Sequence, residues 1–220
     1  MSGPHHHGDH DADVSQMFTQ ETWDARYAES DRIWSGRPNP RLVEQVSAVT
    51  PGRALDIGAG EGADAVWLAS QGWEVTAVDI SEVALSRAAA HAAEAGVADR
   101  VTTLHQDVLG DDPLPGDADL VSAQFLHPPV ERFDAIMQHL GEAVRPGGLL
   151  LIVGHHPEDV TSGVRSGHGH PELLFTPDRV VAALPAEAWD VRVAEAQPRT
   201  VDGPDGPVTV TDTVVLAARR

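Results

Sequence analysis

A short apolar segment runs directly into a turn that carries glycine at three alternate positions, in the sequence LDIGAGEGADA at 55–65. The apolar residues at 53–57 predict a buried strand, and residues 61–71 have the spacing of a helix that ends at Gly72. Glycine has no Cβ, so such a turn can bend sharply and approach a ligand closely. Strand, glycine turn and helix in this order are typical of the start of a parallel α/β sheet.

Strand-like and helix-like segments alternate along the rest of the chain. Further strands are predicted at 74–80, 100–108, 118–126 and 148–154, and helices at 81–95 behind the cap Ser81, at about 130–144 and at 176–184. Two alternating segments, 189–197 and 207–219, flank the turn sequence VDGPDG and predict a terminal hairpin. The order predicts a doubly wound, Rossmann-like α/β fold with right-handed crossovers and helices on both faces of a seven-stranded sheet.

Composition limits the classes of function. The 220 residues suffice for one well-packed α/β domain. The formal net charge of -19 disfavours nucleic acids and anionic membrane surfaces as partners. The absence of cysteine excludes disulfides, thiolate metal sites and a thiol nucleophile. No apolar run is long enough to cross a bilayer and no N-terminal stretch resembles a signal peptide, so we expect a cytoplasmic protein.

Three parts of the chain are expected to differ in character. Residues 1–14 are rich in His and Asp and predict a disordered tail, residues 15–50 a helical lid segment, and residues 51–220 the Rossmann-like domain. Histidines in the tail could bind a metal ion. So could the histidines of a predicted mobile loop at 161–175, which also contains Arg165. The loop's His168 and His170 have no closely spaced carboxylate, so we predict no metal site.

A carboxylate stands at the end of each of the first three predicted strands. Asp56 precedes the glycines, Asp79 ends the second strand and Asp107 follows the third. In a parallel sheet these ends meet at the edge where ligands bind. A carboxylate beside the glycine turn would repel a pyrophosphate and attract an ammonium group, whereas Asp79 could accept hydrogen bonds from ribose hydroxyls. This pattern suits S-adenosylmethionine better than a dinucleotide, although GAGEGA also fits the dinucleotide pattern.

Together with AVDIS at 77–81, HQDV at 105–108 and RPGGLLLIV at 145–153, these features resemble the class I S-adenosylmethionine-dependent methyltransferases over about residues 20–218. The resemblance implies that fold, including its antiparallel last strand, and S-adenosylmethionine as the cofactor. It implies that the methionine part lies against Asp56, Gly58, Ala59, Gly60 and Gly62, the ribose against Asp79, and the adenine against Asp107 and Val108, with Ile80 and Gln124 also in the cofactor site.

The segment WDARYAESDRIWSGRPNPRLVE at 23–44 resembles the entry segment of small-molecule methyltransferases of the tellurite-resistance and thiopurine type. Its aromatic residues are too many for a solvated leader and must bury against something. We predict a lid in which Tyr27 or Trp34 stacks near the sulfonium and Arg37 pairs with the methionine carboxylate. A helix packed on the edge of the sheet is the alternative.

The predicted fourth strand ends in AQFLHPP, which departs from the Asn/Asp-Pro-Pro-aromatic pattern of enzymes that methylate the amino groups of bases or glutamine amides. His127 at this end, and His155 or His156 after the fifth strand, could serve an acceptor because histidine titrates near neutrality. Adjacent residues of an extended chain point opposite ways, so at most one of His155 and His156 should face the site. We assign catalytic roles to His127 and His155.

The expected reaction is direct in-line methyl transfer to a small molecule such as a thiol, a chalcogen oxyanion or a similar nucleophile. Two alternatives stay open. One is an NAD(P)-dependent oxidoreductase, and the other is a non-catalytic metal- or oxyanion-binding protein that has kept the fold.

Overall fold

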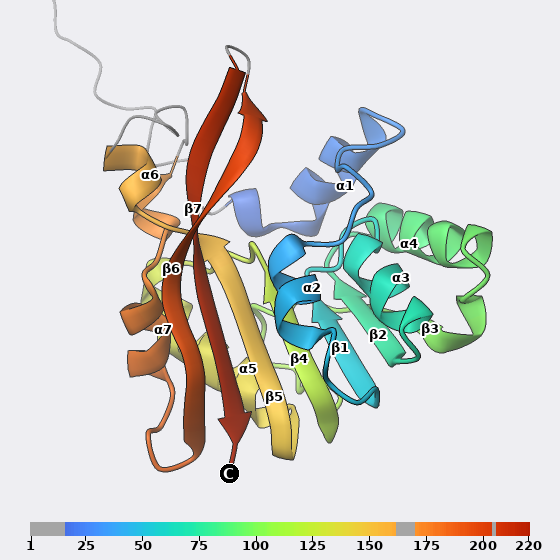
Figure 1. The fold of residues 1–220 in the computed structure, drawn as a ribbon. Helices are drawn as coiled ribbons and strands as arrows, with labels where there is room; N and C mark the ends of the chain where they lie inside the picture. Colours follow the sequence, from blue (N-terminus) through green and yellow to red (C-terminus); the bar gives the residue numbers. More distant parts are fainter. Residues whose placement is uncertain (1–15, 162–169, 204–205) are drawn as a thin grey trace, which may run out of the picture.

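The computed structural model describes residues 16–161, 170–203 and 206–220. Its centre is a seven-stranded sheet of order β3-β2-β1-β4-β5-β7-β6 (Figure 1). The strands are β1 (Arg53–Ile57), β2 (Glu74–Asp79), β3 (Val101–His105), β4 (Ala118–Gln124), β5 (Val144–His155), β6 (Trp189–Gly203) and β7 (Gly206–Arg219). Strands β1 to β5 pair in parallel, and β7 lies antiparallel to both β5 and β6. The predicted doubly wound sheet with an antiparallel last strand is confirmed.

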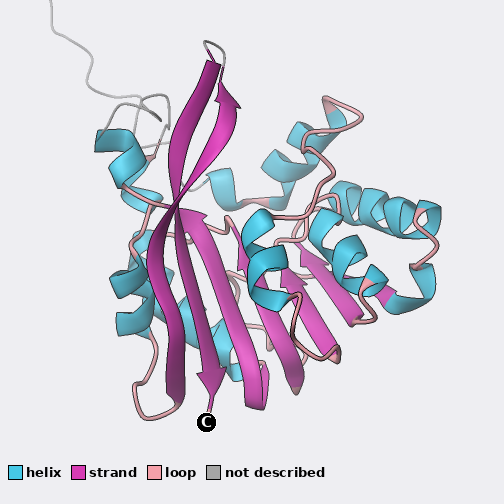
Figure 2. Ribbon diagram, in the orientation of Figure 1, coloured by secondary structure: helices cyan, strands magenta, loops and turns pink. Residues whose placement is uncertain are grey.

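Helices cover both faces of this sheet (Figure 2). They are α1 (Gln20–Ala28), α2 (Pro40–Val46), α3 (Ala63–Ser70), α4 (Glu82–Glu94), α5 (Phe133–Glu142), α6 (Glu158–Thr161) and α7 (Pro177–Ala183). Strand β5 shows why two layers are needed: Leu151 and Val153 lie in a core with residues of α2 and α3, whereas Leu150 and Ile152 lie in a core with residues of α5 and α7. Successive side chains of a strand point to opposite faces, so a continuously apolar strand requires cover on both. No helix among the described residues is long and apolar enough to cross a bilayer.

Strands β3 and β4 end earlier than predicted, for local reasons. Strand β3 stops at His105 because the chain turns at Asp107, whose Oδ1 accepts a hydrogen bond from the N–H of Leu109 at 2.9 Å. Strand β4 stops at Gln124 because Phe125 adopts a φ of +57°, outside the extended region. Both turns bring polar or aromatic side chains to the carboxyl edge of the sheet.

The terminal hairpin is longer than predicted. The sequence VDGPDG was expected to form the turn, but the ladder continues through the pairs Val201↔Val208 and Gly203↔Gly206. As a result, β6 and β7 project beyond the carboxyl ends of the other strands (Figure 1). The predicted helix at 130–144 also differs: it opens with a 3-10 turn over Val130–Arg132, and the chain is already in β5 at its last position.

A buried ion cluster joins the hairpin to α2. Asp212 of β7 is 0% exposed, and its Oδ2 accepts hydrogen bonds from Arg199 Nε at 2.7 Å and Arg41 Nε at 3.2 Å. Arg41 also donates to the carbonyls of Gln197 and Pro198. Since a fully buried carboxylate is costly unless it is paired, these contacts fix the hairpin relative to the segment that leads into the sheet.

Candidate active site

The glycine loop between β1 and α3 has the backbone that its sequence requires. Gly58, Gly60 and Gly62 have φ values of +67°, +53° and +81°, the left-handed region that favours glycine. A Cβ on Gly62 would lie 2.7 Å from the Cβ of Ala88 in α4, and one on Gly60 would lie 2.8 Å from the Tyr27 hydroxyl. The loop therefore packs tightly against α4 on one side and against the N-terminal segment on the other.

Asp56, the last but one residue of β1, carries a buried carboxylate. It is 2% exposed, and among the described residues its Oδ2 has no hydrogen-bond partner. Burial raises the pKa of Asp56 well above its usual range, and repulsion from Asp64 and Asp79 adds to the rise. Burial also raises the pKa of Asp64 to about 6. A cation placed beside Asp56 would relieve both effects.

Asp79 lies at the neighbouring strand end and holds the glycine loop. Its Oδ2 accepts a hydrogen bond from Gly60 N–H, and its Oδ1 accepts one from Ser81 N–H, both at 2.8 Å. Burial raises the pKa of Asp79 in spite of these bonds. Because a carboxylate offers about four acceptor positions, Asp79 can still accept a hydrogen bond from a ligand's hydroxyl group.

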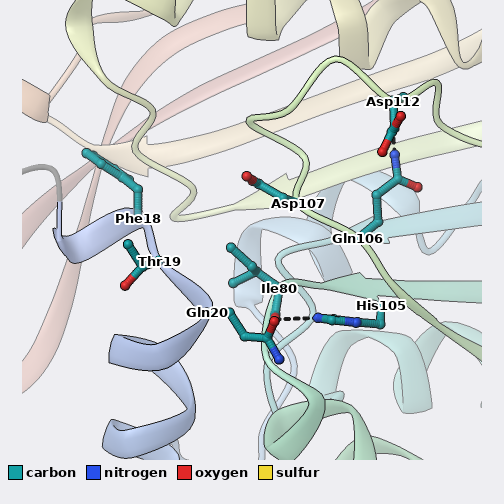
Figure 3. A pocket seen from close by; sticks show the side chains of 8 residues that line it. All are labelled: Phe18, Thr19, Gln20, Ile80, His105, Gln106, Asp107 and Asp112. Carbon is teal, nitrogen blue, oxygen red and sulfur yellow. Dashed lines mark hydrogen bonds between the residues drawn. The ribbon is translucent and has the colours of Figure 1, made fainter.

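A pocket of about 470 Å³ lies beyond the ends of β2 and β3. It is lined by Phe18, Thr19, Gln20, Ile80, His105, Gln106, Asp107 and Asp112 (Figure 3). Figure 3 shows the Asp107 carboxylate directed into the space between the apolar side chains of Phe18 and Ile80. The pocket can thus offer a planar aromatic group two apolar walls and one acceptor. Val108, the other residue expected at the adenine, does not line this pocket, and its side chain lies in the core that α5 and α7 cover.

The N-terminal segment covers the glycine loop. Tyr27 is buried, and its hydroxyl accepts a hydrogen bond from Trp34 Nε1 at 3.0 Å. Burial raises the pKa of Tyr27 to about 12, so the hydroxyl stays protonated at neutral pH. Trp34 is 45% exposed above this contact. The predicted partner of the methionine carboxylate, Arg37, is exposed, and the structure gives its side chain no ion pair with any described residue.

Aromatic side chains gather at the ends of β4 and β5. The His127 and His155 rings stack with centroids 5.1 Å apart, and Phe125 lies 4.4 Å from His155. The Nε2 of His127 accepts a hydrogen bond from the backbone N–H of His155 at 3.1 Å. His156 turns away toward Glu158, so one of the two adjacent histidines belongs to this cluster, as expected.

Gln124 lies just before the histidine cluster in the chain, and the Phe175 ring packs against His127. Gln124 Nε2 donates to Ser122 Oγ at 2.7 Å, and its buried Oε1 has no hydrogen-bond partner among the described residues. The Phe175 ring lies 5.5 Å from that of His127. A Cβ on Gly154 would lie 2.3 Å from the Phe175 ring, so a glycine is required beneath it.

Of the residues that line the pocket, the reasoning from sequence named only Ile80 and Asp107 as site residues, and it also missed three charged residues near the glycine loop and the histidine cluster. Glu61, inside the glycine motif, is 4% exposed and forms an ion pair with Arg87 of α4 at 2.9 Å. Arg199 of the hairpin reaches 6.0 Å from the centroid of the Phe125 ring. A charged residue inside a turn of small residues could have identified Glu61 as a site residue from the sequence. Nothing in the local sequence indicates the partners of Arg87 and Arg199.

The residues described by the structure contain no group of three or more His, Asp or Glu side chains that could hold a metal ion. His170, one of the predicted loop histidines, lies 3.1 Å from Glu172, so the expectation that no carboxylate lies close to it was wrong. The tail at 1–14, together with Arg165 and His168, lies outside the described residues.

Part of the chain is similar to a known protein family. Residues 54–148 match the family described as "Methyltransferase domain". The ribosomal RNA small subunit methyltransferase C of Alcanivorax borkumensis is 33% identical over 110 residues, which are 48% of this chain and 33% of that protein. The ubiquinone biosynthesis O-methyltransferase of Xylella fastidiosa is 31% identical over 118 residues, 52% of this chain and 47% of that protein. The chain thus spans less than half the length of these curated relatives.

Solved structures agree over nearly the whole chain. One, from work on the conversion of a disulfide bond into a thioacetal group during echinomycin biosynthesis, has a TM-score of 0.73 at 23% identity and covers 91% of this chain and 92% of that one. TehB from Haemophilus influenzae has a TM-score of 0.68 at 16% identity and covers 90% of this chain and 67% of that one. At these identities the likeness shows the fold alone. The matched residues 54–148 include the glycine loop and all three acidic strand ends, so this part of the chain is similar to that methyltransferase family, and the sheet has the class I methyltransferase fold.

Proposed function

We propose that this protein transfers the methyl group of S-adenosylmethionine to a small molecule. The observation that carries the proposal is the meeting of Asp56, Asp79 and Asp107 at one edge of the sheet, beneath a segment whose Tyr27 touches the glycine loop. The unpartnered buried oxygen of Asp56 suits the ammonium group of an amino acid, and a dinucleotide would place phosphate charge there instead.

The residues present fit this cofactor part by part. Asp56 and the glycine loop would hold the methionine part, and Asp79 would accept from the ribose hydroxyls. The pocket between Phe18 and Ile80 would hold the adenine, with Asp107 accepting from its exocyclic amine. We keep Arg37 as the proposed partner of the methionine carboxylate, since its exposed side chain makes no ion pair with any described residue.

Bound S-adenosylmethionine supplies an electrophilic methyl group on a sulfonium. The protein's tasks are to place a nucleophile in line with that methyl group and to exclude water. Tyr27 and Trp34 cover the glycine loop on one side, while the cluster of Phe125, His127 and His155 lies at the ends of β4 and β5. We therefore place the acceptor between the N-terminal segment and this cluster.

The two histidines differ in what they can do. Nε2 of neutral His127 already accepts a backbone hydrogen bond, so its ring proton sits on Nδ1 and it has no second basic nitrogen. His127 would have to break this bond to act as a base. We therefore assign any proton removal from a thiol or hydroxyl acceptor to His155, and to His127 the positioning of that residue.

A small acceptor fits the charge of the protein. Nucleic-acid binding needs Lys and Arg along a phosphate track, and this chain has a net charge of -19. One relative is a ribosomal RNA methyltransferase and another acts in ubiquinone biosynthesis, so names alone leave both classes open. Within the small-molecule class, the aromatic segment over the glycine loop supports the tellurite-resistance and thiopurine group, and so a thiol, a chalcogen oxyanion or a similar nucleophile.

Two experiments test the proposal. Calorimetry with S-adenosylhomocysteine should show binding, whereas NADH should show none; the reverse result would establish the oxidoreductase alternative. Formation of S-adenosylhomocysteine from S-adenosylmethionine would then be followed with thiophenol, phenol, tellurite, selenite and bulk transfer RNA. Turnover with transfer RNA but with none of the small molecules would refute the small-molecule acceptor. Cofactor binding without turnover on any acceptor would favour a binding protein.

A further inference from the structure

The side chain of Glu61 turns from the glycine loop toward the N-terminal segment. It is 4% exposed, and its carboxylate accepts hydrogen bonds from Trp34 N–H at 3.0 Å and from Ile33 N–H at 3.2 Å. It also accepts from Arg87 Nη1 at 2.9 Å. Burial raises the pKa of Glu61, but the hydrogen bonds from Trp34, Arg87 and Ile33 lower it by more, so the group is ionised at neutral pH.

Arg87 extends this contact to a second point of the segment. Its Nη2 donates to the carbonyl oxygen of Tyr27 at 2.7 Å. On the other side, His91 Nδ1 lies 2.8 Å from the Glu61 carbonyl oxygen. One ion pair thus joins three parts of the chain: the glycine loop, helix α4 and the turn that follows α1.

The hydrogen bonds that residues 31–38 make beyond their own neighbourhood converge on Glu61. They form neither helix nor strand, and among the described residues every hydrogen bond they make outside 27–39 ends on Glu61. The remaining bonds are local, such as Arg37 N–H to Ser35 Oγ, or join Trp34 to Tyr27. A segment of this kind has a low local opening free energy unless a specific contact holds it.

We propose that Glu61, paired with Arg87, is a positioning residue that holds residues 31–38 over the glycine loop before the cofactor binds. It thereby sets Trp34 and Tyr27 beside Gly60, so the cofactor meets a preformed cover. The role in cofactor binding rests on the proposed function. The position of the segment in the free protein does not.

The bond between Arg32 and Ile33 reports directly on this contact. The N–H of this peptide bond is one of the two backbone groups that donate to Glu61, and trypsin must pull the chain into an extended form to cut the bond. The other arginine of the segment, Arg37, precedes Pro38 and is not a trypsin site. Cleavage at Arg32, followed by mass spectrometry of the intact protein, therefore measures opening of this segment alone.

The variant is Glu61→Gln, and the matched control is Glu94→Gln, an exposed glutamate of α4. Without cofactor, we expect Glu61→Gln to be cut at Arg32 at least tenfold faster than the wild type and Glu94→Gln at the wild-type rate. Saturating S-adenosylhomocysteine should slow the cut in Glu61→Gln, and KM for S-adenosylmethionine should rise more than kcat falls. Equal cleavage rates in the wild type and Glu61→Gln would overturn the proposal.

Two further measurements test the proposal even if Glu61→Gln folds poorly. In the cofactor-free wild type, the amides of Ile33 and Trp34 should exchange hydrogen for deuterium more than tenfold slower than those of residues 35–37. Equal exchange would overturn the proposal without any mutation. Arg87→Lys, which keeps a positive charge but cannot reach both partners, should give intermediate cleavage. If the wild type does not bind S-adenosylhomocysteine, the proposed function fails while cleavage in the free protein still decides the role of Glu61.

Discussion

Replacing Asp64 by Asn should stabilise the protein at neutral pH. Burial raises the pKa of this carboxyl from 3.8 to about 6, so the folded protein binds a proton there more tightly than the unfolded chain does. Stability therefore falls as the pH rises through the window between these two values, and stays lowered above it. At about 1.36 kcal/mol for each pKa unit, the penalty at pH 8 reaches about 3 kcal/mol.

Asparagine removes the charge and keeps the contact that the structure requires. Asp64 Oδ1 accepts a hydrogen bond from Asn39 N–H at 2.6 Å, and an amide oxygen at the same place can accept it too. The change also removes one of the repulsions on Asp56. We expect Asp64→Asn to raise the free energy of unfolding by about 1–3 kcal/mol at pH 8 and by less than about 1 kcal/mol at pH 4.

Urea unfolding followed by circular dichroism at pH 4, 6 and 8 measures this difference. The matched control is Asp178→Asn, since Asp178 is an exposed carboxylate in the first turn of α7, as Asp64 is in the first turn of α3. The control corrects for the loss of a negative charge near a helix N-terminus. A gain that does not change with pH, or a loss of stability at pH 8, would refute the assignment of the raised pKa to Asp64.

Three other substitutions test the site directly. Asp79→Ala should weaken binding of S-adenosylhomocysteine by about 1–3 kcal/mol through lost charge-assisted hydrogen bonds, and unchanged affinity in calorimetry would place the ribose elsewhere. Gly60→Ala should lower the thermal midpoint more than Gly96→Ala: both glycines have positive φ, but only the first would bring a Cβ within 2.8 Å of the Tyr27 hydroxyl. His155→Ala should reduce kcat for a thiol or phenol acceptor by about 10²–10⁴ while the cofactor Kd stays constant, and a normal rate removes its role as a base.

The succession of strands along the chain and the place of the carboxylates could be predicted because both depend on short stretches of sequence. Five of the strands are short apolar or β-branched runs, and their carboxyl ends must meet once the sheet is parallel. That argument placed Asp56, Asp79 and Asp107 on one edge before any coordinates. The same local reasoning predicted the cap Ser81, which accepts a hydrogen bond from Ala84 N–H at 3.1 Å.

Contacts between distant segments could not be predicted in this way. Glu61 and Arg87 are 26 positions apart, and Asp212 and Arg41 are 171 apart. Each pair depends on how a helix or hairpin packs, which no periodicity in one segment encodes. The length of the hairpin was misjudged for a related reason, since glycine and proline near a turn reveal little about how far two strands remain paired.

The buried acids connect the stability of this protein with its proposed chemistry. Three carboxylates with raised pKa values, Asp56, Asp64 and Asp79, lie in or beside the glycine loop, and only backbone groups are known to donate to them. By contrast, the pKa of Glu61, which has an arginine partner, is lowered. A protein selected for stability alone would have supplied a cation or a neutral residue to the first group as well. Leaving negative charge uncompensated there costs folding free energy in the free protein, and a positively charged ligand recovers it on binding. Under the proposed function, this contrast separates Asp56 and Asp79, which would hold the cofactor, from Glu61, which would position the cover above it.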